Sequence, residues 1–503
     1  MATLTGYLAG AVMTVVTIGL GVKVMSAILS HRRRVDAMRR FPQDPTHPFF
    51  GHLLHYAGPN EKGLAFLRSW TEKFPRIFVG WLFYLPLVIV NHPDTLRVIL
   101  KSPGLKAKRF YNFIQPYIGE GLFRSEGERW ARNRRVLTTA LHARALRNYV
   151  ELKNRCTDTL LIKFQQAAET SQPLKAFVNI TMFSFDVILR CAMSYQTDCQ
   201  IEGLSHPYVE AVDSIVALIV RRFFRPWLHN DFIYFLTSEG RRFKQKCNFV
   251  HGVADFIIKS RREKLKTEDP TDTEGKRHMD LLDILLTATD EDGVGMTDVE
   301  IRDEVNSFLL AGHDATASAI SWTLYSIAKH GDVQQKVCQE IDELMADRSC
   351  TDILWEDLSQ LPYLTMVMKE SLRLHSIAPF IHRQMTCDTR VDDLVVPAGT
   401  EVSLSLYNTH HNPQVWEDSM KFDPNRFLPE NSEKRNPYAF VPFSAGPRNC
   451  VGQNFALNEM KIVLARILYR FNIKLDPSHT VEKVHALVMQ PTDDINLLVT
   501  SWR

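Results

Sequence analysis

The sequence predicts a mainly α-helical fold with a small β portion (α+β), in one large domain that follows an N-terminal transmembrane helix. Three observations support this class: long segments with apolar residues at spacings of three and four, few strand regions, and an uncharged apolar stretch at the N-terminus. No internal repeat and no second linker divides the rest of the chain. We therefore expect an anchor at 1–30, a basic and proline-rich linker at 31–50, and a single domain at 51–503.

The N-terminal stretch has the length and the flanking charges of a signal anchor. Leu4 to Val22 contains no charged residue, which is long enough to cross a hydrocarbon core of about 30 Å. Arginines cluster after the stretch, at 32–34 and 39–40, and none precedes it. Because basic residues stay on the cytoplasmic side, we expect a single pass with the domain in the cytosol. Three prolines within 42–48 then predict a stiff linker.

Composition excludes several classes of function. Hydrophobic residues make up 45% of the 503 residues and charged residues 23%, which is typical of a folded domain. The net charge of +3, from 60 basic and 57 acidic residues, is too balanced for a general nucleic-acid binder. Eight widely spaced cysteines without a C-x-x-C pair predict free thiols in a reducing compartment. The P-loop, H-E-x-x-H and G-x-S-x-G motifs are absent from the sequence.

Apolar spacing predicts the main helices, at 151–170, 251–266, 297–330, 333–346, 363–374 and 455–471. The longest of them begins with the capping box Thr297-Asp298-Val299-Glu300. Two regions predict strands. Residues 77–90 form a strand pair around a turn at 84–86, and residues 394–405 place strands on either side of a turn at 397–399.

One segment carries a specific chemical signal. Phe443 to Gly452 fits the pattern F-x-x-G-x-R-x-C-x-G at all five fixed positions, which chance would produce roughly once in several thousand chains. A thiolate that binds iron must stay deprotonated, and the helix predicted after Cys450 offers it amide donors and a positive helix end. Gly446 and Gly452 permit tight turning and close approach to a flat macrocycle. Arg448 can bind a propionate through two hydrogen bonds.

This segment resembles the haem-binding loop of the cytochromes P-450, which are membrane-bound haem-thiolate monooxygenases. The resemblance implies the cytochrome P-450 fold and a haem b whose iron is bound by Cys450, with Phe443 and Gly452 beside it. Electrons would come from NADPH through a flavoprotein reductase, and cytochrome b5 is a second candidate donor. The implied location is the endoplasmic reticulum membrane, with the catalytic domain in the cytosol.

Further motifs of that family follow in the expected order. Glu370 and Arg373 form its E-x-x-R pair, and Arg426 is the third member of a structural triad that would clamp the proximal side of the haem. Trp130 and Arg134 resemble its W-x-x-x-R element, in which one helical turn places an indole and a guanidinium on the same face. Together with Arg383 and Arg448, they would form a cationic rim for the two haem propionates.

The distal element departs from the family pattern. Residues 311–316, Ala-Gly-His-Asp-Ala-Thr, resemble the oxygen-binding element A/G-G-x-D/E-T-T/S, in which Gly312 would loosen the helix and Asp314 would feed protons through water. The usual threonine is Ala315 here, and Thr316 lies about 100° further round the helix. Three outcomes follow: Thr316 and water substitute, the substrate's own hydroxyl completes the relay, or the chemistry needs no relay.

Residues 278–322 and 436–443 look like the fourth family of cytochromes P-450, whose members hydroxylate fatty acids and related lipids, often at the terminal carbon. Some members carry a glutamate esterified to the haem where this chain has Ala311, so the haem here would be held by Cys450 and noncovalent contacts alone. Two alternatives stay open: an isomerase or dehydratase that acts on lipid peroxides without NADPH, and a non-enzymatic haem sensor. Independence from NADPH would mark the first, and absence of any product the second.

Two segments are candidates for the substrate pocket. Residues 110–123 contain five aromatic side chains and could cover its distal side. Residues 220–227 mix arginines with bulky apolar groups, which fits a segment that dips into a membrane surface and equally fits an amphipathic helix end on the core. No residue is singled out as the binding site for a substrate carboxylate.

Overall fold

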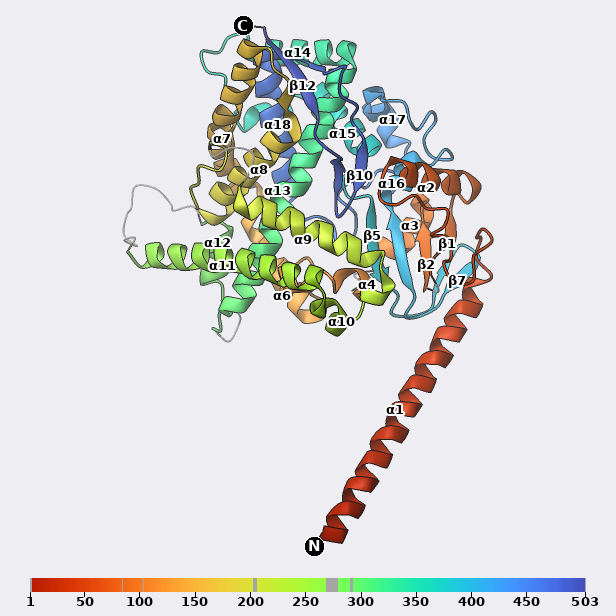
Figure 1. The fold of residues 1–503 in the computed structure, drawn as a ribbon. Helices are drawn as coiled ribbons and strands as arrows, with labels where there is room; N and C mark the ends of the chain where they lie inside the picture. Colours follow the sequence, from red (N-terminus) through yellow and green to blue (C-terminus); the bar gives the residue numbers. More distant parts are fainter. Residues whose placement is uncertain are drawn as a thin grey trace.

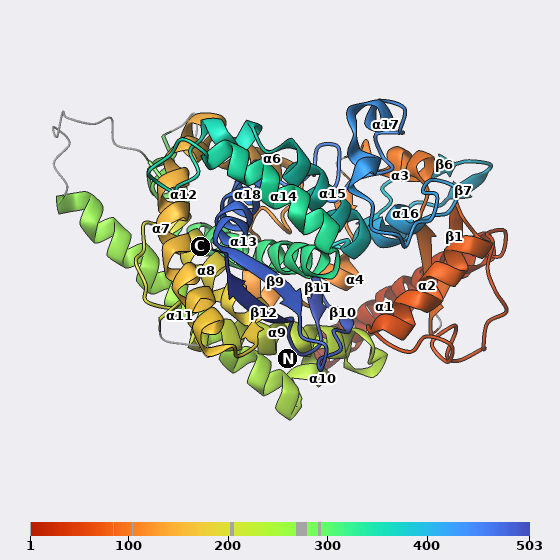
Figure 2. The ribbon, with the colours of Figure 1, turned by 90° about the horizontal axis from the view of Figure 1, so that it is seen from above.

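The computed structural model describes residues 2–83, 85–102, 104–201, 206–267, 279–289 and 293–502. Tyr84, in the first predicted turn, and His278, at the start of the segment 278–322, lie outside these residues. The predicted class is confirmed: the domain is mainly helical, with small sheets (Figures 1 and 2). All eight cysteines lie within the described residues and are free thiols.

The helices have the following bounds: α1 (Ala2–Met38), α2 (Glu61–Lys73), α3 (Pro93–Leu100), α4 (Lys108–Tyr111), α5 (Gln115–Ile118), α6 (Gly127–Ala140), α7 (Ala143–Thr170), α8 (Ala176–Met193), α9 (Pro207–Phe223), α10 (Asp231–Leu236), α11 (Ser238–Thr267), α12 (Leu281–Thr287), α13 (Asp298–Lys329), α14 (Gly331–Met345), α15 (Pro362–His375), α16 (Leu406–His411), α17 (Pro429–Glu433) and α18 (Gln453–Arg470). The strands are β1 (Ile77–Leu82), β2 (Leu85–Val90), β3 (Leu105–Lys106), β4 (Leu174–Lys175), β5 (Phe380–Gln384), β6 (Thr389–Val391), β7 (Leu394–Val396), β8 (Glu401–Ser405), β9 (Phe471–Leu475), β10 (Lys483–His485), β11 (Met489–Pro491) and β12 (Asn496–Ser501).

α1 extends beyond the predicted end of the anchor at residue 30. It runs as one helix to Met38 and projects from the rest of the molecule (Figure 1). Its last turn docks on the domain, because Met38 and the following Phe41 are buried against the sheet that contains β1, β2 and β8. Arg34 Nη1 also donates to the carbonyl of Gly399 at 3.2 Å. Residues 31–38 of the predicted linker are therefore helical, and the rest of the linker, at 39–50, forms turns and extended chain with one isolated bridge at His47.

Whether α1 spans a membrane stays a prediction, because most side chains before residue 32 lie outside the described part of the chain. Within the described part, one helix is long and apolar enough to span a bilayer by length and composition. This is α8, of which 83% is buried inside the domain, as in a core helix of a folded protein.

The helices predicted from apolar spacing are confirmed as α7, α11, α13, α14, α15 and α18. α7 and α11 begin earlier than expected, and their added turns also bury apolar residues at helical spacing, such as Leu146 and Val150 in α7 and Phe243 and Val250 in α11. The capping box of α13 is also confirmed: Glu300 N donates to Thr297 Oγ1 at 3.3 Å, and Thr297 N donates to Glu300 Oε2 at 2.9 Å. α13 passes through the helical half of the domain, where it packs on α8, α11, α15 and α18 (Figure 2).

The largest sheet in the described residues has the strand order β1-β2-β8-β5-β3. β1 and β2 form the predicted antiparallel pair, whereas β2 and β8 are parallel. Strands lie on both sides of the predicted turn at 397–399, but they do not pair with each other: β7 pairs with β6, and β8 pairs with β2 and β5. The smaller sheets are β4-β12-β9 and the two hairpins β10-β11 and β6-β7.

Candidate active site

The loop from Phe443 to Gly452 folds back on itself before it enters α18. Cys450 N donates to the carbonyl of Phe443 at 2.9 Å, and Asn449 N donates to the carbonyl of Gly446 at 3.1 Å. Gly446 has a φ of +73°, and a Cβ at this position would collide with the carbonyl oxygen of Leu100 at the end of α3. The tight turn and the close approach both require glycine, although the group that Gly446 approaches is the protein backbone.

Cys450, which carries the thiol of the loop, lies just before the start of α18, and part of the residue reaches the protein surface. The Gly452 amide donates a hydrogen bond to the thiol, as expected of free amides at a helix N-terminus. Arg134 fixes the neighbouring residue, since its guanidinium donates to the carbonyl and to Oδ1 of Asn449 at 2.7 and 2.6 Å. Desolvation by the surrounding protein raises the pKa of the Cys450 thiol, and the Gly452 amide and Arg134 lower it. A metal cation bound to the sulfur would lower the pKa of the Cys450 thiol further and stabilise the thiolate.

Arg448 points from the same loop towards α6. Its Nη1 donates to the carbonyl of Ser125 at 2.7 Å, and its guanidinium lies 4.0 Å from the centre of the Trp130 ring. Burial, together with the nearby charges of Arg383 and Arg134, lowers the pKa of Arg448 to about 10. The predicted rim of Trp130, Arg134, Arg383 and Arg448 is therefore brought together around the thiol loop.

Lys106 joins this rim and was not predicted from the sequence. It lies on β3 directly opposite Arg383 on β5. Burial lowers the pKa of Lys106 well below its usual value, and the charges of Arg383 and Arg448 lower it further, while the Glu126 carboxylate raises it. The sequence did not indicate that Lys106 lies beside Arg383, because this position depends on pairing between strands that are far apart in the chain.

The buried positive charge of the rim fits the haem that the sequence implies. Burying several cations side by side costs free energy unless anions compensate them. Within the described residues, Glu126 is the carboxylate that raises the pKa values of both Lys106 and Arg448. The surplus of positive charge beside a cysteine thiol matches a group that carries two carboxylates and a thiolate-binding metal.

Glu370 and Arg373 form a fully buried ion pair on α15. Arg373 Nε and Nη2 donate to the two carboxylate oxygens of Glu370 at 2.7 and 2.8 Å, and both side chains are 0% exposed. Arg426 completes the predicted group with an Nε to Glu370 Oε1 distance of 3.4 Å. Arg373 also donates to backbone carbonyls of three later residues, His410, Ser419 and Lys421. The three predicted side chains thus tie α15 to the segment that leads into the thiol loop.

The distal element occupies the middle of α13. Ala311 is exposed and Gly312 and Ala315 are partly exposed, so these small residues share one accessible face of the helix. Asp314 and Thr316 are buried on either side of that face, at 7% and 4% exposure. α13 is continuous through Gly312, and the local loosening of the helix that the motif implies stays a prediction.

Gly312 makes room for the neighbouring helix α8. A Cβ at this position would lie 2.7 Å from Cδ1 and Cγ1 of Ile188 on α8. α13 and α8 pack along their lengths, and the glycine allows the close approach at this point.

Asp314 has a specific partner that the sequence did not reveal. Gln490 Nε2, on β11, donates to Asp314 Oδ1 at 2.7 Å. Burial raises the pKa of Asp314 to about 6, and the hydrogen bond from Gln490 acts in the opposite direction. Asp314 therefore exchanges protons near neutral pH, which suits a group that transfers them.

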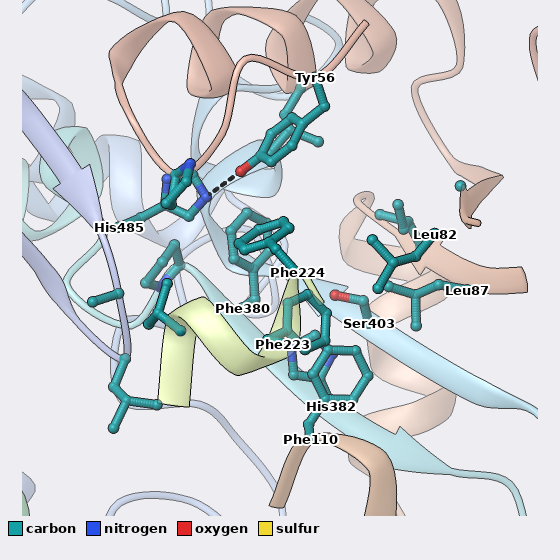
Figure 3. A pocket seen from close by; sticks show the side chains of 18 of the residues that line it. Tyr56, Leu82, Leu87, Phe110, Phe223, Phe224, Phe380, His382, Ser403 and His485 are labelled. Atoms are coloured by element: carbon teal, nitrogen blue, oxygen red, sulfur yellow. Dashed lines mark hydrogen bonds between the residues drawn. The ribbon is translucent and has the colours of Figure 1, made fainter. Parts of the chain in front are cut away.

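A cavity of about 310 Å³ lies between the β1-β2 hairpin, the end of α9 and the tip of the β10-β11 hairpin. Figure 3 shows aromatic side chains gathered in it, and Tyr56 Oη hydrogen-bonded to His485 Nε2 at 2.7 Å. Both candidate pocket segments contribute to the lining: Phe110, Tyr111, Phe113, Ile114 and Phe123 from the first, and Val220, Phe223 and Phe224 from the second.

Two of the three arginines of the second segment are held by the protein itself. Arg222 is 1% exposed, pairs with Asp231 at 2.5 Å and lies over the Tyr234 ring. Arg225 pairs with Glu239 at 3.0 Å. These contacts fit an amphipathic helix end on the core, but Arg221 and Trp227 are 62% and 63% exposed, which fits a segment that meets a membrane surface as well.

The cytochrome P450 family model matches residues 42–499, and the chain belongs to this family. It is a cytochrome P450 monooxygenase with a haem-thiolate cofactor.

Among its relatives, cytochrome P450 4F2 of Homo sapiens is 41% identical over 453 residues, which cover 88% of this chain and 86% of that protein. The ultra-long-chain fatty acid omega-hydroxylase of Homo sapiens is 38% identical over 473 residues, which cover 92% and 88%. The crystal structure of the cytochrome P450DA heme domain is similar in fold, with a TM-score of 0.80 at 24% identity, over 92% of this chain and 98% of that chain.

When bound, the haem supplies the activation of dioxygen. In this chain Cys450 would bind the iron, and the cationic rim would hold the propionates. The small residues on the accessible face of α13 would leave that side of the haem open to dioxygen and water.

Proposed function

We propose that this protein inserts one oxygen atom of O2 into fatty acids or related lipids, at or near the terminal carbon. The observation that carries this proposal is the cavity of about 310 Å³. Its volume lies in the range of small-molecule sites, and its walls are mostly aromatic and aliphatic, with few polar groups. Such a lining favours a hydrocarbon chain. The naming of one relative as a fatty acid omega-hydroxylase supports the same class of substrate.

Each site residue has a proposed role. Cys450 binds the haem iron, and Asp314, with Thr316 and water, passes protons to the distal side across the face that contains Gly312. The haem is held by Trp130, Arg134, Arg383, Arg448, Phe443 and Gly452. Glu370, Arg373 and Arg426 maintain the proximal side. The contacts described above support these assignments, because they gather the residues around one thiol loop and one helix face.

We also propose that the enzyme is a single-pass protein of the endoplasmic reticulum membrane, with its catalytic domain in the cytosol. NADPH would reduce it through a flavoprotein reductase, and cytochrome b5 could supply the second electron. The uncharged stretch before the arginine cluster supports the anchor. The docking of the last turn of α1 on the β-sheet supports a fixed attachment of the domain to that anchor.

The direct test uses the full chain with a reductase, NADPH, isotopically labelled dioxygen and a panel of saturated and unsaturated fatty acids. We expect mass spectrometry to find the label at the terminal or the adjacent carbon. The Cys450→Ser variant should lose this product, whereas Cys387→Ser, at another exposed cysteine, should retain it. Conversion of lipid hydroperoxides without NADPH, and no labelled product from fatty acids, would contradict the proposal and favour the isomerase alternative.

A further inference from the structure

The β10-β11 hairpin connects the cavity to the distal helix. At its tip, His485, Ala486 and Leu487 line the cavity. Figure 3 shows His485 from this tip bonded to Tyr56 at the cavity wall. Three residues after Leu487, Gln490 contacts Asp314 of α13. One short element thus contacts both the proposed substrate space and the proposed proton donor.

The backbone of the hairpin is fixed to α13 next to its turn, at Met489, which pairs with His485. The carbonyl of Met489 accepts hydrogen bonds from Ser318 Oγ and from Trp322 Nε1, the latter at 3.1 Å. Met489 N donates to the carbonyl of Ile377, just after α15, at 2.8 Å. Ser318 lies one helical turn after Asp314, so the backbone contact and the Gln490 contact occupy neighbouring positions on the same helix. The side chain of Gln490 therefore starts from a backbone that is held in place.

Asp314 lies among few other ionisable groups. Asp213 of α9 and Tyr117 of α5 are close enough for the charge of Asp314 to raise their pKa values. His313, the neighbour of Asp314 on α13, faces Asp213 instead. Neither Asp213 nor Tyr117 supplies a positive charge that would hold the Asp314 carboxylate. The donor that the structure gives to Asp314 is the neutral amide of Gln490.

We propose that Gln490 is a positioning residue for proton delivery, which holds the Asp314 carboxyl in one orientation beside the accessible face of α13. This inference rests on the proposed role of Asp314. In each transfer the O–H bond of the Asp314 carboxyl breaks, the proton passes to an adjacent water, and solvent returns a proton to the carboxylate. A neutral amide fixes the carboxyl through one oxygen without trapping it as a permanent ion pair, as an arginine or lysine would.

The test compares Gln490→Leu, which removes the donor, with Thr492→Val on the strand end that follows. Thr492 is exposed and contacts Glu482 rather than Asp314. The holoenzyme is supplied with reductase and NADPH, and peroxide release and fatty acid product are measured across a range of pH. We expect Gln490→Leu to lower the ratio of product to peroxide several-fold. Loss of the hydrogen bond to the charged carboxylate should also move the pH of half-maximal product yield upward by about one unit.

A double-variant comparison separates positioning from general damage. If Gln490 acts through Asp314, then Gln490→Leu should add nothing to the defect of Asp314→Asn. Gln490→Asn keeps the amide and should fall between the wild type and Gln490→Leu, which covers the case in which leucine disturbs folding. The inference would be overturned if Gln490→Leu kept the wild-type product ratio and pH profile. If Asp314→Asn were defective in the same experiment, the proposed role of Asp314 would still stand. A fully active Asp314→Asn would remove that role and the inference with it.

Discussion

Gly446 illustrates how a single residue sets the shape of the thiol loop. Its backbone is left-handed, and its Cα faces a carbonyl oxygen of α3 at a distance that leaves no room for a side chain. The loop thus depends on contacts with the protein as well as with the haem it would hold. A substitution here should affect both the stability of the fold and the retention of haem.

We predict that Gly446→Ala lowers the melting temperature and the haem content. The left-handed backbone alone costs alanine roughly 1–2 kcal/mol, and the contact with Leu100 adds to this. The matched control is Gly252→Ala in α11, where a Cβ would meet no atom within 4 Å. There alanine should stabilise the helix by about 1 kcal/mol. Thermal unfolding and the ratio of haem to protein absorbance measure both effects, and equal melting temperatures for the two variants would contradict this account.

For single residues, the sequence predicted those site residues that lie close together in the chain. The order of Phe443, Gly446, Arg448 and Cys450 within one loop predicted that they act together, and the loop geometry brings them together. Lys106 and Gln490 escaped prediction, because each acquires its role through a contact across the fold. The pattern of a single chain does not specify which strand lies opposite which helix.

Among the elements, α13 and α8 show that one glycine can serve packing where a motif indicates catalysis. The loosening of the helix at Gly312 stays a prediction, whereas the structure shows that this glycine leaves room for Ile188 of α8 and that α13 is unbroken there. The helices themselves were predictable, because apolar residues recur in the sequence with the 3.6-residue period of a helix. The pairing of β7 and β8 was less predictable, because adjacent strands can join different partners.

We predict that Gly312→Ala destabilises the fold by roughly 1–3 kcal/mol, because the new methyl group overpacks against Ile188. Ile188→Ala removes both side-chain carbons that lie 2.7 Å from the new methyl group, Cδ1 and Cγ1, and should cost about 2–5 kcal/mol alone. The double variant should be more stable than the sum of the two single effects implies. Melting temperatures of the four proteins test this coupling, and strictly additive losses would show that the two helices do not meet as described.

For the molecule as a whole, buried carboxyls make stability depend on pH. Glu304 on α13 is 0% exposed and accepts hydrogen bonds from Leu122 N at 2.9 Å and from Asn133 Nδ2 at 2.7 Å. Burial raises the pKa of Glu304 from its usual 4.5 to about 7. Between these two values the folded state keeps a proton that the unfolded state has lost. The contribution of Glu304 to stability therefore falls as the pH rises through this window, by up to about 1.4 kcal/mol per pH unit.

We predict that Glu304→Gln is more stable relative to the wild type at pH 8 than at pH 5, because the amide stays neutral at both. Glu433→Gln, at an exposed carboxylate, should show no such difference. Thermal unfolding of the three proteins at the two pH values provides the measurement. A pH-independent offset for Glu304→Gln would mean that this carboxyl is ionised throughout.

The apolar core helix α8 has a consequence for how the chain is made. The eighteen residues of α8 are long and apolar enough, by length and composition, to enter a membrane as a second span. This would matter during synthesis at a membrane, before the domain has folded. In the folded domain Asp186, within that segment, pairs with Arg190 at 2.5 Å and accepts a hydrogen bond from Gln200. Before folding, the same two charges penalise entry into lipid by about 2.5–3.5 kcal/mol each at a helix centre. Asp186 and Arg190, which pair in the folded core, would therefore disfavour insertion of this segment before it folds, and replacing both with apolar residues would favour it.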